Sequence, residues 1–232
     1  MHIKRIHSWT KNYKKAVQIQ QELSKSVIIR KDHGKICTVA GADVSYDKHS
    51  DRVFAAVIVF AINKKLEKIE EATAIEKARF PYIPGLLSFR EAPVLLKSFK
   101  KLKTEPDIIV FDGQGIAHPR FFGIASHIGV ILDKPAIGCA KSCLVGEYSE
   151  VENNVGANSR LIYNDKTVGV ALRTKLNTNP VFVSVGHKTD LSFAIQFILK
   201  ICRGYRIPEP VRQAHLLVNT LRMQNLKNTR TI

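Results

Sequence analysis

The sequence predicts an α/β domain in which helices cover both faces of one mixed β-sheet. Two β-rich segments joined by a short polar stretch come first, and short apolar strands then alternate with segments of helical periodicity. Strands joined by a tight turn pair antiparallel, whereas strands separated by a helix pair in parallel. The chain has 232 residues, of which 45% are hydrophobic, and no repeat or long linker divides it, so we expect a single domain.

The first part of the chain predicts a helix followed by an antiparallel meander. Apolar residues recur at helical spacing over 12–29, which favours an amphipathic helix. Segments 36–46 and 53–62 are β-rich, and the polar residues 47–51 between them predict a turn. A third, weaker strand is expected over 65–75.

The later part predicts alternating strands and helices. Ser88 and Glu91 have the spacing of a capping box, which predicts that a helix over 88–102 begins at Ser88. Further strands are expected over 107–111, 135–140, 168–173 and 180–185, and further helices over 121–131, 190–202 and 208–222. We expect residues 223–232 to form a frayed polar tail outside a domain that covers 1–222.

Neither a membrane span nor a metal–thiolate site is predicted. The longest apolar run, 53–62, is far shorter than the roughly 20 residues that cross a bilayer. The first residues do not have the pattern of a signal peptide, so we expect a cytoplasmic protein. The cysteines lack zinc-site spacing, and we expect Cys37, Cys139 and Cys202 to be buried, reduced thiols.

The formal net charge of +16 is concentrated at the two ends of the chain. Residues 1–35 have a net charge of +7 and residues 200–232 of +6, whereas residues 36–199 have only +3. Such a surplus favours a polyanionic partner, because each neutralised phosphate releases counterions. We therefore expect nucleic acid as the partner. A generic solvated basic surface is the alternative, and charge does not separate an enzyme from a passive binder.

Three acidic residues lie at positions where a carboxylate is energetically unfavourable unless it has a function. Asp43 interrupts an uncharged β-rich segment, where alternation places it on the same face as Gly41. Asp112 ends an apolar strand, at the sheet edge where α/β proteins gather their sites. Glu91 lies in the first turn of a predicted helix. Clustered carboxylates repel one another and persist mainly by holding a cation, for which Mg²⁺ is suited. A strand-closing turn, an Asp-Gly turn and a helix cap are the respective structural alternatives.

His215 and Lys141 are weaker candidates. His215 lies on the apolar stripe of the last predicted helix, where a lone histidine is more often a core residue than a ligand. Lys141 follows a strand end, where it is suited to hold a phosphate as a point charge, although most such lysines are simply exposed. The residues by themselves indicate a basic α/β protein, with phosphodiesterase activity as one option.

Six motifs make the sequence similar to the endonuclease V family. In chain order they are GADVSY (41–46), PYIPGLLSFRE (81–91), DGQGIAHPRFFGIASHIGV (112–130), GCAKSCLVG (138–146), SVGHKTDL (184–191) and GYRIPEPVRQAHL (204–216). The resemblance spans roughly residues 12–222. It implies an RNase H-like fold and a magnesium-dependent deoxyribonuclease of DNA repair, in which Mn²⁺ can substitute. The enzyme would recognise deoxyinosine, the product of adenine deamination. It would hydrolyse the second phosphodiester bond 3′ to the lesion and leave 3′-hydroxyl and 5′-phosphate ends.

The resemblance also implies roles for individual residues. The expected catalytic residues are Asp43, Glu91, Asp112, Lys141 and His215. The three acids would hold the metal, and Lys141 would contact the phosphate near the scissile bond. His215 would complete the centre, either as a ligand or by positioning water, since the family also has Asp at this position.

Two further groups of residues match the family's nucleic-acid contacts. The expected strand-separating wedge consists of Pro81, Tyr82, Ile83, Pro84 and Gly85. The expected pocket for the lesion base consists of Gly85, Leu87, Gly113, His118, Gly123 and Ile124. Arg90, Arg120 and Lys141 are expected to contact the nucleic-acid backbone, and His118 is a second candidate for that role.

Other functions remain open at this stage. An endoribonuclease that cleaves inosine-containing RNA would use the same metal centre, although the wedge motif PYIPG favours DNA. A basic nucleic-acid-binding protein without catalysis is a third option, against which the three acids argue. A dimeric junction resolvase would need a self-complementary surface. We expect a monomer that binds DNA containing deoxyinosine, with single-stranded DNA or RNA as further ligands, and that does not bind membranes.

Overall fold

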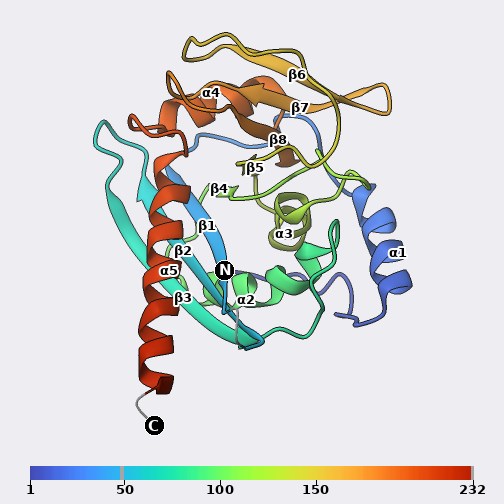
Figure 1. The fold of residues 1–232 in the computed structure, drawn as a ribbon, viewed down its shortest axis with the longest axis vertical. Coiled ribbons are helices and arrows are strands. Elements are labelled where there is room, and N and C mark those ends of the chain that lie inside the picture. The colour runs from blue at the N-terminus through green and yellow to red at the C-terminus, as the bar shows by residue number, and fades with distance from the viewer. Residues whose placement is uncertain (48–49, 231–232) are drawn as a thin grey trace.

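The computed structural model describes residues 1–47 and 50–230, and within them it has one eight-stranded sheet in the order β3-β2-β1-β4-β5-β8-β7-β6 (Figure 1). The strands are β1 (Thr38–Tyr46), β2 (Arg52–Ala61), β3 (Lys68–Lys77), β4 (Ile108–Phe111), β5 (Ala136–Ala140), β6 (Asn158–Tyr163), β7 (Lys166–Leu172) and β8 (Val181–His187). The helices are α1 (Tyr13–Ser24), α2 (Leu87–Lys101), α3 (Ile124–Leu132), α4 (Leu191–Ile201) and α5 (Glu209–Arg230). Part of the predicted turn, 48–49, and the end of the predicted tail, 231–232, lie outside the described residues.

The strand pairing confirms the predicted mixed sheet. Strands β1, β2 and β3 form the antiparallel meander, and β1, β4 and β5 are parallel neighbours. The sheet then continues antiparallel from β5 through β8 and β7 to β6. Strand β6 was not predicted, because it lies at the sheet edge and Leu161 is its one fully buried residue. Its hairpin with β7 turns at Asn164 and Asp165, whose positive φ angles of 48° and 58° suit a two-residue turn.

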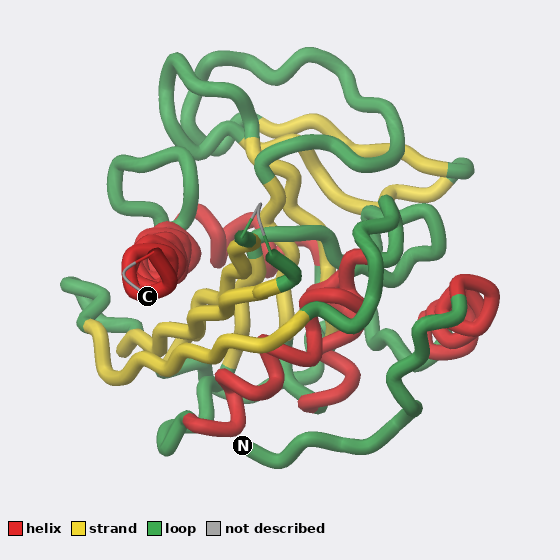
Figure 2. The backbone as a smooth tube through the Cα atoms, turned by 60° about the horizontal axis from the view of Figure 1, so that its bottom comes forward, coloured by secondary structure: helices red, strands yellow, loops and turns green. Residues whose placement is uncertain are grey.

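Helices cover both faces of the sheet (Figures 1 and 2). On one face, Ile109 and Phe111 of β4 share a core with α2 and α3. On the other face, Ile108 and Val110 of the same strand share a core with α4 and α5. A strand covered on both sides is apolar at every position, which explains why β4 has no alternating pattern. Helix α1 packs at the side of the molecule against Phe80 and the start of α2.

Helix α5 extends beyond its predicted end near residue 222, so the prediction of a frayed tail over 223–232 is wrong as far as Arg230. Tertiary contacts hold this second half of the helix on the meander. Arg222 donates a hydrogen bond to the backbone oxygen of Tyr46 (3.1 Å), and Arg52 donates to Asn225 Oδ1 (2.6 Å). These partners lie far away in the sequence, so local composition did not reveal them.

The predicted capping box at Ser88 is also wrong. Helix α2 begins one residue earlier, at Leu87, and no side chain caps it. The hydroxyl of Ser88 instead lies 3.0 Å from Nδ1 of His127 on α3, and Glu91 accepts a hydrogen bond from Tyr46. Both side chains therefore have tertiary partners in place of the local backbone.

The cysteine prediction holds for Cys139, which is buried, but Cys37 is exposed and Cys202 is half-buried. Cys37 lies outside the sheet because it precedes the first residue of β1. Among the described residues, no helix combines the length and apolar character needed to cross a membrane.

Candidate active site

Asp43, Asp112 and His215 converge at the carboxyl edge of the central strands. Strands β1 and β4 are parallel, and Ala42 pairs with Phe111, so the next residues, Asp43 and Asp112, lie side by side. His215 comes from α5 on the adjoining face. One ligand atom from each of these three side chains lies within 4.8 Å of the other two. The structure thus brings together three of the five predicted catalytic residues in one group.

Gly41 allows α5 to approach β1 closely enough for this convergence. A Cβ atom at Gly41 would lie 2.1 Å from the carbonyl carbon and oxygen of Pro210, in the first turn of α5. Gly41 and Asp43 share one face of β1, as predicted from strand alternation. The same face receives His215, whose Nδ1 lies 2.7 Å from Oδ2 of Asp43.

The hydrogen bonds of Asn219 assign the proton on His215. Nδ2 of Asn219 donates to the backbone oxygen of His215 at 2.9 Å, which fixes the orientation of the amide. The same Nδ2 lies 3.1 Å from Nε2 of His215, so Nε2 accepts and the ring proton is on Nδ1. Ser45 Oγ donates to the amide oxygen of Asn219 at 3.1 Å. In this arrangement, His215 donates to Asp43 and supports that carboxylate.

Lys141 and Asp112 form an ion pair at the same edge. Lys141 directly follows β5, and its ammonium group contacts Oδ2 of Asp112. Arg206 donates from Nη2 to the backbone oxygen of Lys141 at 2.5 Å, and from the same group to Pro180 at 2.8 Å. The backbone of Lys141 is therefore held in place while its side chain stays half-exposed beside the acids.

Glu91 reaches this region from α2 on the opposite face of the sheet. It is half-buried, and Oε1 accepts a hydrogen bond from the hydroxyl of Tyr46. Burial, together with the nearby charges of Asp43 and Asp112, raises the pKa of Glu91 to about 7 against the effect of that hydrogen bond. Burial and the charge of Asp112 likewise raise the pKa of Asp43 to about 6, against the hydrogen bond from His215. Carboxylates that destabilise one another in this way favour a bound cation.

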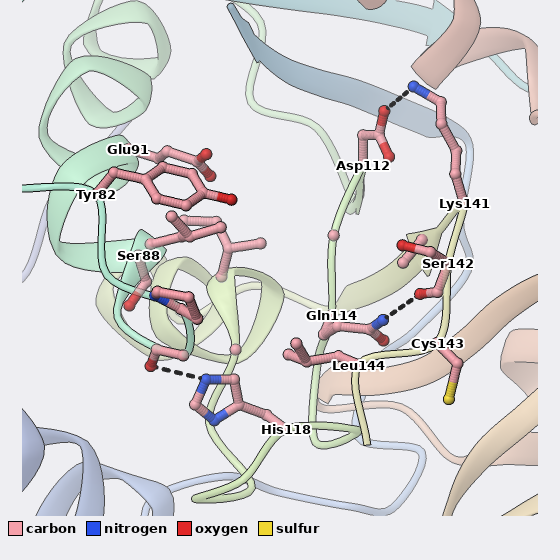
Figure 3. Close-up of a pocket in the computed structure, with 17 residues that line it drawn as sticks. Tyr82, Ser88, Glu91, Asp112, Gln114, His118, Lys141, Ser142, Cys143 and Leu144 are labelled. Carbon is pink, nitrogen blue, oxygen red and sulfur yellow. Dashed lines mark hydrogen bonds and ion pairs between the residues drawn. The ribbon is translucent and has the colours of Figure 1, made fainter. Parts of the chain in front are cut away.

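Glu91, Asp112 and Lys141 line one cleft together with the predicted base pocket (Figure 3). Its volume is about 380 Å³, within the ~300–1,000 Å³ typical of ligand sites. Figure 3 shows Tyr82 and Glu91 on one wall, opposite Asp112 and Lys141. All six residues predicted for the base pocket line this cleft, namely Gly85, Leu87, Gly113, His118, Gly123 and Ile124.

The loop predicted as the wedge is held through the backbone oxygen of Gly85. His118 Nε2 donates to this oxygen at 2.9 Å, Arg120 Nη2 at 2.5 Å and Gln20 Nε2 at 3.1 Å. Gly85 has φ +75°, a conformation that favours glycine. Three donors on one carbonyl restrain the loop, while Tyr82 stays 65% exposed near its tip.

Three side chains that were predicted to contact the nucleic-acid backbone instead have partners within the protein. They are His118, Arg120 and Arg90. Burial lowers the pKa of His118 to about 4, aided by the charge of Arg120, so the ring is neutral. Arg90 donates from Nη1 to the backbone oxygen of Phe80 at 2.6 Å. Its guanidinium lies 5.1 Å from the ring centre of Tyr46. In this structure these side chains brace the walls of the cleft.

Sequence reasoning missed several of the residues that support the site. Gln20 is fully buried next to Ile19 on the apolar side of α1. A polar residue on the apolar side of a helix could have indicated a supporting role from the sequence. Gln114 donates from Nε2 to the backbone oxygen of Ser142 at 3.0 Å and so joins two walls of the cleft. No local pattern marked Asn219 or Tyr46, because their roles depend on partners on other elements.

Comparisons with known proteins agree on one family. The family model described as Endonuclease V matches residues 21–216. The endonuclease V of Dictyoglomus turgidum is 48% identical over 206 residues, which cover 89% of this chain and 89% of that protein. The crystal structure of an endonuclease V from Bacillus subtilis superposes with a TM-score of 0.92 at 32% identity and covers 98% of this chain and 100% of its own. The endonuclease V of Ciona intestinalis, in complex with a 24mer DNA containing an inosine followed by a ribo-adenosine, gives a TM-score of 0.80 at 26% identity, covering 91% of this chain and 97% of that chain.

Proposed function

The chain belongs to the endonuclease V family, and on that premise we propose that it is a magnesium-dependent endonuclease of DNA repair that cleaves beside deoxyinosine. Its mixed sheet with helices on both faces is the RNase H-like fold of this family. The proposed reaction is hydrolysis of the second phosphodiester bond 3′ to the lesion, which leaves 3′-hydroxyl and 5′-phosphate ends. We further propose a cytoplasmic monomer with a single catalytic domain, which extends past the predicted boundary at residue 222 because α5 continues to Arg230.

One observation carries this proposal. A single cleft contains two of the three predicted metal-binding acids, Glu91 and Asp112, together with Lys141 and all six predicted base-pocket residues. The third acid, Asp43, joins Asp112 and His215 in the group of potential metal ligands. A base held in the pocket and a phosphate at the acids would thus belong to one strand.

The side chains present fit a hard divalent cation. Asp43 and Asp112 supply carboxylate oxygens from adjacent strands, and both act on the pKa of Glu91, so three carboxylates share one region. Mg²⁺ prefers one or two carboxylates together with water and substrate phosphate, and Mn²⁺ accepts the same ligands. We assign Asp43 and Asp112 as the ligands and Glu91 as the third acid of the centre. When bound, the ion would activate water and offset the charge that develops on the phosphate and the leaving oxygen.

Two other side chains would act around this centre. His215 donates from Nδ1 to Asp43 and would hold that carboxylate in the orientation that binding requires. Lys141 contacts Asp112 in the absence of substrate. On binding, its ammonium group would exchange this partner for a phosphate oxygen near the scissile bond, acting as a point charge.

The lesion base would occupy the glycine-rich end of the cleft. Gly85, Gly113 and Gly123 lack side chains there, so backbone groups can approach a base edge. Hypoxanthine and adenine differ at position six, where one has an acceptor oxygen and the other a donor amine, and backbone donors can distinguish them. Tyr82 at the loop tip would replace the stacking that the extruded base loses.

An endoribonuclease acting on inosine-containing RNA is the second candidate. The Ciona intestinalis complex supports this candidate, because the DNA in that complex has a ribo-adenosine after the inosine. The metal centre would be the same for both substrates, so the substrate has to be tested directly.

The deciding experiment uses three end-labelled strands of one sequence. One contains deoxyinosine in DNA, one contains inosine in RNA, and one contains deoxyinosine followed by a single ribonucleotide. Each is incubated with Mg²⁺, with Mn²⁺ or with EDTA, and the cut is mapped at nucleotide resolution. We expect metal-dependent cleavage of the DNA strand at the second bond 3′ to the lesion. Cleavage of the RNA strand alone would establish the endoribonuclease, and binding without cleavage of any strand would contradict both.

A further inference from the structure

Tyr46 links the strand that carries Asp43 to the helix that carries Glu91. It is the last residue of β1, three positions after Asp43. Because side chains alternate along a strand, Asp43 faces α5 while Tyr46 faces the opposite side, where α2 lies. The packing agrees with this alternation, since Tyr46 lies against the core formed with α2, and Asp43 contacts His215 of α5.

The hydroxyl of Tyr46 donates a hydrogen bond to Oε1 of Glu91. Tyr46 is itself held at two points, one on its ring and one on its backbone. The guanidinium of Arg90 lies over the ring at 5.1 Å from its centre, and Arg222 of α5 donates to the backbone oxygen of Tyr46 at 3.1 Å. Helices from both faces of the sheet thus determine where the hydroxyl lies.

This contact limits the positions that Glu91 can adopt. A free glutamate rotates about three side-chain bonds and loses that freedom on binding an ion. With Oε1 held by Tyr46, one carboxylate oxygen remains for an ion or for its coordinated water. A carboxylate whose other oxygen is hydrogen-bonded is a preorganised ligand, as is generally found for residues that support metal sites.

We propose that Tyr46 is a positioning residue of the metal centre, whose hydroxyl orients Glu91 toward an ion held by Asp43 and Asp112. This inference rests on the proposed function, because it assumes that the three acids bind a divalent cation. It goes further by assigning a role to a residue outside the acidic group. Tyr46 would not touch the ion or the substrate, and its effect would pass entirely through Glu91.

The test is the substitution Tyr46→Phe in the full chain. Phenylalanine keeps the ring that Arg90 and the core contact, and it removes one oxygen. Mn²⁺ binding to the metal-free protein is measured by isothermal titration calorimetry without nucleic acid, so the readout does not depend on cleavage. We expect Mn²⁺ affinity to fall about 10-fold, the typical effect of removing a group that supports a metal ligand. Tyr163→Phe is the matched control, because Tyr163 packs against Phe121 in a different core cluster and should retain wild-type affinity.

A double-mutant cycle separates positioning from a general loss of structure. Glu91→Gln keeps the shape of the side chain and removes the charge that Tyr46 would orient. If Tyr46 acts through Glu91, adding Tyr46→Phe to Glu91→Gln produces no further loss of Mn²⁺ affinity. An equal loss in both backgrounds, or an affinity for Tyr46→Phe within two-fold of wild type, would overturn the inference.

The outcomes also distinguish this inference from the proposed function. If the wild-type protein binds no Mn²⁺, the proposed metal centre fails; if wild type and Tyr46→Phe bind it equally, only the role of Tyr46 fails. Far-UV circular dichroism checks the fold of each variant. If Tyr46→Phe proves less stable, the same comparison is made from the Mn²⁺-induced rise in Tm, which should be smaller than in wild type.

Discussion

Nδ1 of His215 lies 2.7 Å from Oδ2 of Asp43, and this hydrogen bond joins the last helix to the central strand. Since Asn219 occupies Nε2 of the same ring, the proton on Nδ1 is directed at Asp43. A nitrogen that carries a proton has no lone pair for a metal ion. The arrangement therefore favours support of Asp43 over direct ligation by His215.

The first prediction concerns this supporting role. His215→Asn should retain much of the Mg²⁺-dependent cleavage, because an amide can still donate to Asp43, whereas His215→Ala should lose about 10- to 100-fold. The measurement is the cleavage rate of a deoxyinosine strand over a Mg²⁺ titration. Equal losses in the two variants would show that the imidazole itself is needed.

The second prediction concerns the approach of α5 to β1. Gly41→Ala places a Cβ 2.1 Å from backbone atoms of Pro210, so the helix has to shift. We expect a loss of unfolding free energy of roughly 1–3 kcal/mol or more, typical of overpacking, and a loss of cleavage as His215 leaves Asp43. Urea unfolding measures the first effect. Gly34→Ala is the control, because a Cβ there has no neighbour within 4 Å; comparable destabilisation of both variants would contradict the prediction.

The third prediction concerns stability against pH. Burial raises the pKa of Asp43 from 3.8 to about 6 and that of Glu91 from 4.5 to about 7. Between about pH 4 and pH 7 the folded state therefore binds more protons than the unfolded state, so this contribution to stability is lost as pH rises. Without metal, the unfolding free energy of the Asp43→Asn variant should fall less between pH 5 and pH 8 than that of the wild-type protein. Urea titrations in EDTA at pH 5 and pH 8 test this, and an unchanged pH dependence in the variant would refute it.

Bound metal should offset the loss of protein stability at high pH. Mn²⁺ binds the deprotonated carboxylates, so its stabilising effect should be larger at pH 8 than at pH 5. The rise in Tm on adding Mn²⁺ measures this fourth expectation. The control is Asp43→Asn, in which the rise should be smaller at pH 8. A larger rise at pH 5 than at pH 8 would speak against the acids as the binding site.

The fifth prediction concerns Tyr82, which is 65% exposed at the mouth of the cleft. Tyr82→Ala should reduce the preference for deoxyinosine over undamaged DNA by roughly 1–3 kcal/mol, the usual contribution of base stacking, and should change overall DNA affinity less. Tyr82→Phe keeps the flat ring and should behave like wild type. Competition binding with matched strands measures both the lesion preference and the overall DNA affinity. An unaltered lesion preference in Tyr82→Ala would contradict the proposed role of Tyr82 as a wedge.

Periodicity and motifs in the sequence predicted the mixed sheet, the positions of most elements and the face on which Asp43 lies. These features depend on the two-residue repeat of strands and the 3.6-residue repeat of helices, which any local segment displays. The resemblance to the endonuclease V family also predicted six residues that line the cleft, including Gly123 and Ile124. Local sequence patterns were sufficient to predict helices and strands, because the repeat that defines each of them lies within one segment of the chain.

Only the tertiary structure decided which side chains are partners. Glu91 has the spacing of a helix cap, yet it accepts from Tyr46 on another element, and Gly85 is held by Gln20 from 65 positions earlier in the chain. His215 meets Asp43 across 172 positions. Hydrogen bonds of this kind form only after helices and strands have packed, and a buried polar group takes whichever partner that packing supplies. The site therefore depends on how the elements meet, which local sequence patterns do not determine.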